Sequence, residues 1–148
     1  PVARVRHRAR HDELAVIGGS AGSHLAAFLA YTPDDSRFEG TGQPSTGGTK
    51  LAAAALHGCP NDLTAYASFS ADQQGTVRAL LGTQAPTMEQ LREASPRTLV
   101  RAGSIPTLVL HGQNDTVVPL DQATGQSSGR KSISSRNGTR SCLRRRFE

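Results

Sequence analysis

Ser20 is the residue of this sequence best suited to covalent chemistry. It stands at the centre of Gly18-Gly19-Ser20-Ala21-Gly22, which fits the pattern G-x-S-x-G of a nucleophile elbow. A serine hydroxyl attacks a carbonyl carbon when a sharp turn projects it and a base accepts its proton. The backbone N–H of Ala21 would help to stabilise the resulting oxyanion, aided by a helix N-terminus. The motif therefore predicts Ser20 as nucleophile and Ala21 as oxyanion donor.

The flanking residues predict a strand, a sharp turn and a helix. The apolar residues 14–17 precede the glycines, and small and apolar residues at helical spacing continue to about Tyr31. Pro33 then ends the helix. We expect Gly18 and Gly22 to let strand and helix approach, and Ser20 to be strained. A purely structural glycine turn is the alternative interpretation.

Asp115 is the second candidate. It follows the β-branched apolar stretch 105–110, which predicts a strand, and 51–56 predicts another buried parallel strand. Open parallel sheets place ligands and catalytic groups just beyond the carboxyl ends of their strands. Two helices are expected, at 72–82 and 87–94. A carboxylate that only braces its turn is the alternative role for Asp115.

Length and charge divide the chain into three parts. Its 148 residues are enough for one domain, and the net charge is +5. Residues 1–11 carry four arginines, and 130–148 carry seven basic residues and one acid, so the basic character lies at the two ends. We expect a basic leader at 1–11, an α/β domain at 12–123, and a disordered Ser- and Arg-rich tail at 124–148.

Several classes of site and location are disfavoured. No metal-ligand spacing is present, and a disulfide between Cys59 and Cys142 is improbable. A phosphate-binding loop is disfavoured because Gly48 stands where Lys would follow Gly42 and Gly47. We expect no metal or organic cofactor. No apolar run reaches the length of a membrane span, and no signal peptide is visible, which favours the cytoplasm.

Two segments together resemble an α/β-hydrolase. They are 18–26, GGSAGSHLA, and 106–119, PTLVLHGQNDTVVP, with further likeness at 58–63 and 80–96. The resemblance covers about 13–123 and is closest to the esterase and lipase branch, in its carbohydrate-esterase-like or hormone-sensitive-lipase-like form. It implies a doubly wound, mostly parallel sheet, with Ser20 as nucleophile and Asp115 as triad acid.

The implied chemistry is hydrolysis of a small-molecule carboxylic ester through an acyl-enzyme. Ser20 attacks the ester carbonyl, a histidine accepts its proton, and the carboxylate orients that histidine. The family order places this histidine after the acid, yet none follows His111. The second oxyanion donor of the family lies well upstream of the elbow. We therefore expect an incomplete chain whose activity is impaired.

Three histidines that do not follow Asp115 are alternative candidates for the base. His24 lies one helical turn beyond Ser20, where a packing role is expected. His111 is expected to brace a loop, and His57 is expected to be structural. Asp62 is interpreted as a turn or cap residue.

Two other functions remain open. One is a serine peptidase of the prolyl-oligopeptidase type, whose elbow and acid loops look alike. The other is a non-catalytic fragment that binds polyanions through its basic ends, although a specific nucleic-acid site is not expected because aromatic residues do not interleave with the arginines. An uncovered sheet edge at the elbow strand would favour association into homo-oligomers.

Overall fold

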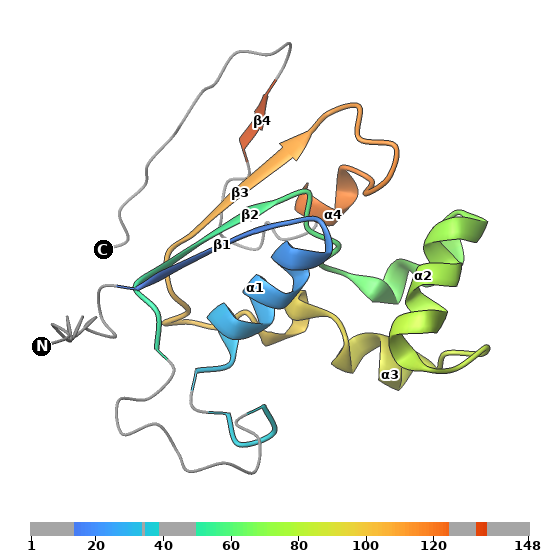
Figure 1. Cartoon of the computed structure of the whole chain (residues 1–148), viewed down its shortest axis with the longest axis horizontal. Coiled ribbons are helices and arrows are strands. Elements are labelled where there is room, and N and C mark those ends of the chain that lie inside the picture. Colours follow the sequence, from blue (N-terminus) through green and yellow to red (C-terminus); the bar gives the residue numbers. More distant parts are fainter. Residues whose placement is uncertain (1–13, 34, 39–49, 125–132, 136–148) are drawn as a thin grey trace, which may run out of the picture.

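A computed structural model describes residues 14–33, 35–38, 50–124 and 133–135, and it contains a parallel sheet (Figure 1). The strands lie side by side in chain order, with all pairs parallel. They are β1 (Ala15–Gly19), β2 (Ala53–His57), β3 (Thr107–Gly112) and β4 (Ile133–Ser135). Their carboxyl ends therefore meet at one edge of the sheet, which is where the sequence predicts the chemistry.

The three predicted strands are present, each one or two residues further along the chain than its apolar run. The run records burial, whereas the strand is bounded by backbone pairing, which continues past the last apolar residue. At that end the Gly58 N–H donates to the Leu110 carbonyl at 2.9 Å. The strand β4 was not predicted, and it lies inside the segment expected to be disordered. Apart from Thr124, the rest of that segment lies outside the described residues, and so does the basic leader.

The longer predicted helices are also present. They are α1 (Ala21–Tyr31), α2 (Ala71–Leu81) and α3 (Met88–Glu93). Ser70 and Thr87 begin α2 and α3 with capping boxes, and Gly82 ends α2 in the left-handed conformation with φ 65°. Three short elements were not predicted, because a helix of only one or two turns shows no clear periodicity. They are η2 (Leu63–Ser68), η3 (Pro96–Leu99) and α4 (Asp121–Thr124).

Small side chains bring α1 close to the sheet. Ala26, Ala27 and Ala30 are buried on the helix, and they pack with Ala54 and Leu56 of β2. A second cluster joins Leu63, Val77 and Leu91 from η2, α2 and α3. The first cluster packs α1 against the sheet, and the second packs α2 and α3 against η2.

The face of the sheet away from α1 is apolar and poorly covered within the described residues. Ile17 of β1 is 82% exposed and Leu110 of β3 is 39% exposed. Successive side chains of a strand point to opposite faces of the sheet, so Val16 and Leu56 pack on the face covered by α1 while Ile17 lies on the other face. The expected homo-oligomer is untested and stays a prediction. No helix of the described part is long and apolar enough to span a membrane.

Candidate active site

Ser20 occupies the turn between β1 and α1 with an unusual backbone conformation. Its φ of 52° and ψ of −124° make it the one non-glycine residue with positive φ in the described part of the chain. Such a conformation costs about 1–3 kcal/mol and persists only where its surroundings enforce it. The strain expected from the motif is therefore present at the serine itself.

Hydrogen bonds on both sides hold the Ser20 backbone in this conformation. Its N–H donates to the carbonyl of His57 at 2.9 Å, and its carbonyl accepts the N–H of Ser23 at 2.9 Å. The buried Ser23 hydroxyl donates to the carbonyls of Ser20 at 2.8 Å and His57 at 3.1 Å. Ser23 thus ties the turn to the end of β2 and offsets the strain at Ser20.

Only one of the two outer glycines is required by space. A Cβ on Gly18 would lie 2.4 Å from the Gly22 carbonyl oxygen and 2.6 Å from the Cα of Ser23, so the strand reaches the helix only without a side chain. A Cβ on Gly22 would meet nothing within 4 Å. The expectation that both glycines make room is therefore right for Gly18 and wrong for Gly22, because the Gly22 hydrogen points away from the strand.

The Ser20 hydroxyl and the Ala21 N–H are both available at the helix N-terminus. Ser20 is the N-cap residue of α1, yet its side chain makes no capping hydrogen bond, unlike the serine that caps α2. Ala21 is the first residue of α1, so its N–H has no acceptor within the helix. Hydroxyl and amide therefore lie on consecutive residues at the positive end of the helix dipole.

Asp115 lies in the turn after β3, with one carboxylate oxygen fully engaged. Its Oδ1 accepts the N–H groups of Val117 and Val118, each at 2.9 Å. The Val118 amide, and then that of Val117, hold the pKa of the carboxyl below its ordinary value, so Asp115 is ionised at neutral pH. Its Oδ2 lies 3.8 Å from Nε2 of His111, beyond hydrogen-bond distance. One oxygen thus anchors the turn and the other is left to accept a further donor.

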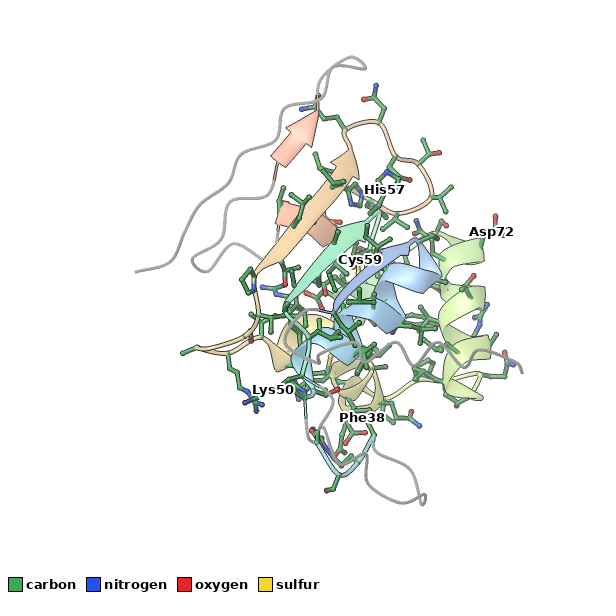
Figure 2. The ribbon with its side chains drawn as sticks, turned by 60° about the vertical axis from the view of Figure 1, so that its left-hand side comes forward. Phe38, Lys50, His57, Cys59 and Asp72 are labelled. Atoms are coloured by element: carbon green, nitrogen blue, oxygen red, sulfur yellow. The ribbon has the colours of Figure 1, made fainter. Side chains whose placement is uncertain are left out.

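The end of β2 separates the Ser20 and Asp115 turns. His57 accepts the Ser20 N–H through its carbonyl, and Gly58, with φ 56°, follows it. A Cβ on Gly58 would lie 3.5 Å from Asp115 Oδ2, so the carboxylate packs against the backbone there. Figure 2 shows His57 at this end of β2. The three strand ends therefore bring the predicted nucleophile and acid to the same edge of the sheet.

A small apolar cavity of about 150 Å³ opens beside Ser20 and Ala21. Leu63, Phe69 and Val77 of the η2–α2 segment form one wall. Val118 forms another, and it belongs to the turn after β3 that carries Asp115, which we call the acid turn. An apolar pocket lined also by a serine and by the first residue of a helix is the arrangement expected of a site for a small, largely apolar ligand. No sequence pattern indicated that the η2–α2 segment would form a wall of this cavity, although the S-x-x-Q cap at Ser70 marks where α2 begins.

None of the histidines in the described residues lines this cavity. The buried His24 places Nδ1 2.6 Å from the Pro60 carbonyl, and burial lowers its pKa, which favours the neutral ring. His111 is buried and its Nε2 lies 2.7 Å from the Val118 carbonyl, where it braces the acid turn as expected. His57 is exposed at the end of β2.

Other polar residues near the site have structural partners. Asp62 caps η2 by accepting the Thr64 N–H, as expected of a cap residue, and it pairs with Arg97. The buried Cys59 is a free thiol whose pKa burial raises to about 11. Among the described residues, no group of three or more His, Cys, Asp or Glu side chains is arranged to hold a metal ion.

Comparison with known families and proteins points in one direction. The family model described as BD-FAE matches residues 5–128. The probable carboxylic ester hydrolase LipM of Mycobacterium tuberculosis is 34% identical over 116 residues, which is 77% of this chain and 27% of LipM. The chain therefore spans little more than a quarter of that relative.

Solved structures of esterases share the fold. The propionate-bound esterase Est2 of Thermogutta terrifontis is 26% identical, with a TM-score of 0.58 over 84% of this chain and 44% of its own. A truncated carbohydrate esterase from gut microbiota is 23% identical, with a TM-score of 0.66 over 82% and 50%. An acetyl ester-xyloside bifunctional hydrolase of Caldicellulosiruptor lactoaceticus is 22% identical, with a TM-score of 0.63 over 83% and 44%.

Proposed function

The chain belongs to the BD-FAE family, within the esterase branch of the α/β-hydrolases, and from this premise we propose that it carries the nucleophile and acid of a carboxylic ester hydrolase. The observation that carries the proposal is the Ser20 turn. A strained serine, whose hydroxyl is not used to cap the helix, precedes Ala21, and both residues line an apolar cavity. This arrangement suits attack on an ester carbonyl.

In the proposed reaction, Ser20 Oγ forms a bond to the carbonyl carbon while a base takes its proton. The carbonyl oxygen gains charge and the Ala21 N–H stabilises it as one oxyanion donor. The alcohol leaves with a proton, and water later releases the acid from Ser20. Asp115 is left to orient such a base through Oδ2, since its Oδ1 is already engaged by the turn.

The cavity beside Ser20 suggests small ester groups. A volume of about 150 Å³ with apolar walls suits a short acyl or alkoxy group. The propionate-bound state of Est2, a solved relative, is in keeping with this size. The peptidase and polyanion-binding alternatives remain predictions, and no feature of the described residues favours either.

Hydrolysis of p-nitrophenyl acetate tests the proposal. We expect the protein-dependent rate to disappear in Ser20→Ala. Ser68→Ala is the matched control, because the Ser68 hydroxyl is exposed and donates only to the local Ala65 carbonyl. Equal rates in the original chain and Ser20→Ala would remove Ser20 from the chemistry.

A further inference from the structure

In the turn that carries Asp115, the N–H and carbonyl groups of both Val117 and Val118 are hydrogen-bonded. One of these bonds comes from a helix that is distant in the sequence. The N–H groups of Val117 and Val118 donate to the Asp115 carboxylate. The Val118 carbonyl accepts from His111, which lies near the end of β3. The Val117 carbonyl accepts the side-chain amide of Gln73, across 2.7 Å and 44 residues of sequence. Gln73 is thus the point at which α2 meets the acid turn.

The two ends of the Gln73 side chain have different tasks. Its Oε1 accepts the Ser70 N–H at 2.8 Å, which completes the capping box of α2. Its Nε2 donates to Val117 outside the helix. Gln90 makes the same capping box in α3, with Oε1 accepting the Thr87 N–H at 3.0 Å. Helix capping alone therefore requires only the oxygen, and the nitrogen of Gln73 serves the turn.

Hydrogen bonds hold the outer part of the turn, because the Val118 N–H donates to Asp115 and the carbonyl of the same peptide group, that of Val117, accepts from Gln73. Val117 is 69% exposed, so it gains little from apolar packing. Gln73 and Val117 both line the cavity beside Ser20. A shift of Val117 would move the amide that fixes Asp115 Oδ1 and the cavity wall together.

We propose that Gln73 is a positioning residue that holds the Val117 peptide, and through it the Asp115 carboxylate, against the cavity beside Ser20. The inference rests on the proposed function only in naming Asp115 as the acid. The hydrogen bond from Gln73 to the Val117 carbonyl, which we call the tether, is independent of that assignment. It predicts that the donor end of the side chain, and not its capping end, governs the order of the acid turn.

Variants that keep one end of Gln73 separate the two tasks. Gln73→Glu retains the capping oxygen and removes the donor, whereas Gln73→Lys retains a donor and removes the capping oxygen. Gln90→Glu is the matched control, because it makes the same change in the equivalent cap of α3. The readout is amide hydrogen exchange at Val117 and Val118, which reports local opening whether or not the chain hydrolyses esters.

We expect exchange at Val117 and Val118 to be about fivefold faster in Gln73→Glu, the size of effect typical of one lost hydrogen bond. Exchange within α2 should be unchanged in that variant, because its cap is intact. Gln73→Lys should restore slow exchange in the turn, and Gln90→Glu should leave the turn unaffected. Unchanged exchange at both valines in Gln73→Glu, or equal acceleration in the Glu and Lys variants, would overturn the tether. A chain with the expected exchange pattern whose Ser20 neither hydrolyses p-nitrophenyl acetate nor becomes acetylated by it would refute the proposed function and leave the role of Gln73 standing.

Discussion

Ser20 donates its backbone N–H to the carbonyl oxygen of His57 at 2.9 Å, and this bond joins the end of β1 to the end of β2. The next residue, Gly58, lies against the Asp115 carboxylate. The proposed nucleophile and acid therefore both lie against the carboxyl end of β2, at its last residue and at the residue that follows it. Each is held through backbone groups, so the geometry of the site depends on the close packing of the strand ends.

The close approach of β1 to α1 predicts opposite outcomes for two glycine substitutions. Gly18→Ala would press a methyl group into the Gly22 backbone, which has no room to move, and should lower the free energy of unfolding by about 2–3 kcal/mol. Gly22→Ala meets no atom within 4 Å, and an alanine in a helix should be neutral or slightly stabilising. Urea unfolding of the two variants measures the difference. Equal losses of stability would contradict the packing described for Gly18.

The hydrogen bonds to Asp115 predict an acid-sensitive contribution to stability. The native pKa lies below the ordinary value of 3.8, so the native state binds the proton less readily than the unfolded chain does. The contribution is complete above about pH 4 and is lost as pH falls through the native pKa. Asp115→Asn keeps an oxygen acceptor without the charge. The free energy of unfolding lost in this variant should be larger at about pH 6 than at about pH 3. A loss independent of pH would contradict the assignment.

Burial of His24 predicts a second pH dependence at higher pH. Its native pKa lies below the ordinary value of 6.5, so the unfolded chain binds the proton more readily. Stability should therefore fall as pH decreases below about 6.5 and level off once pH passes the native pKa. His24→Gln is neutral throughout and should show a smaller fall in unfolding free energy between about pH 7.5 and pH 5.5. An equal fall in both proteins would place the titrating group elsewhere.

The described part of the chain places no histidine in the cavity beside Ser20, and this predicts chemical rescue. Added imidazole should accept the Ser20 proton and raise the rate of p-nitrophenyl acetate hydrolysis. Imidazole also hydrolyses this ester unaided, so the rate in Ser20→Ala at the same imidazole concentration is subtracted. If the rate that remains after this subtraction does not rise with imidazole, the prediction is wrong. If the Ser20-dependent rate without imidazole is lost in His57→Gln, His57 is the base.

The sequence predicted the elements that carry strong patterns. The apolar runs before Ser20 and Asp115 predicted two strands, and the G-x-S-x-G pattern predicted the strained turn, because each signal depends only on neighbouring residues. The strand ends were displaced because pairing with a neighbour, rather than hydropathy, sets where a strand stops. The prediction that Gly22 makes room for the strand was wrong, because the direction in which its Cβ would point depends on the three-dimensional course of the backbone and not on the motif.

The cavity wall and the tether could not be predicted from local patterns. Phe69, Gln73 and Val77 line the same cavity as Ser20 only because the chain after β2 returns to the Ser20 turn. The capping box at Ser70 was readable, but nothing in its spacing shows that the Gln73 nitrogen reaches Val117. Contacts of this kind depend on tertiary packing between segments more than 40 residues apart.

The most direct measurement of the central claim is the capture of an acyl group on Ser20. After incubation with p-nitrophenyl acetate and acid quenching, trypsin releases residues 11–37, a peptide that contains Ser20 and no lysine. Fragmentation in a mass spectrometer then locates any acetyl group. We predict one acetyl group on Ser20, and an unmodified peptide from Ser20→Ala. An unmodified Ser20, or equal acetylation of this peptide in the alanine variant, would contradict the assignment of Ser20 as nucleophile.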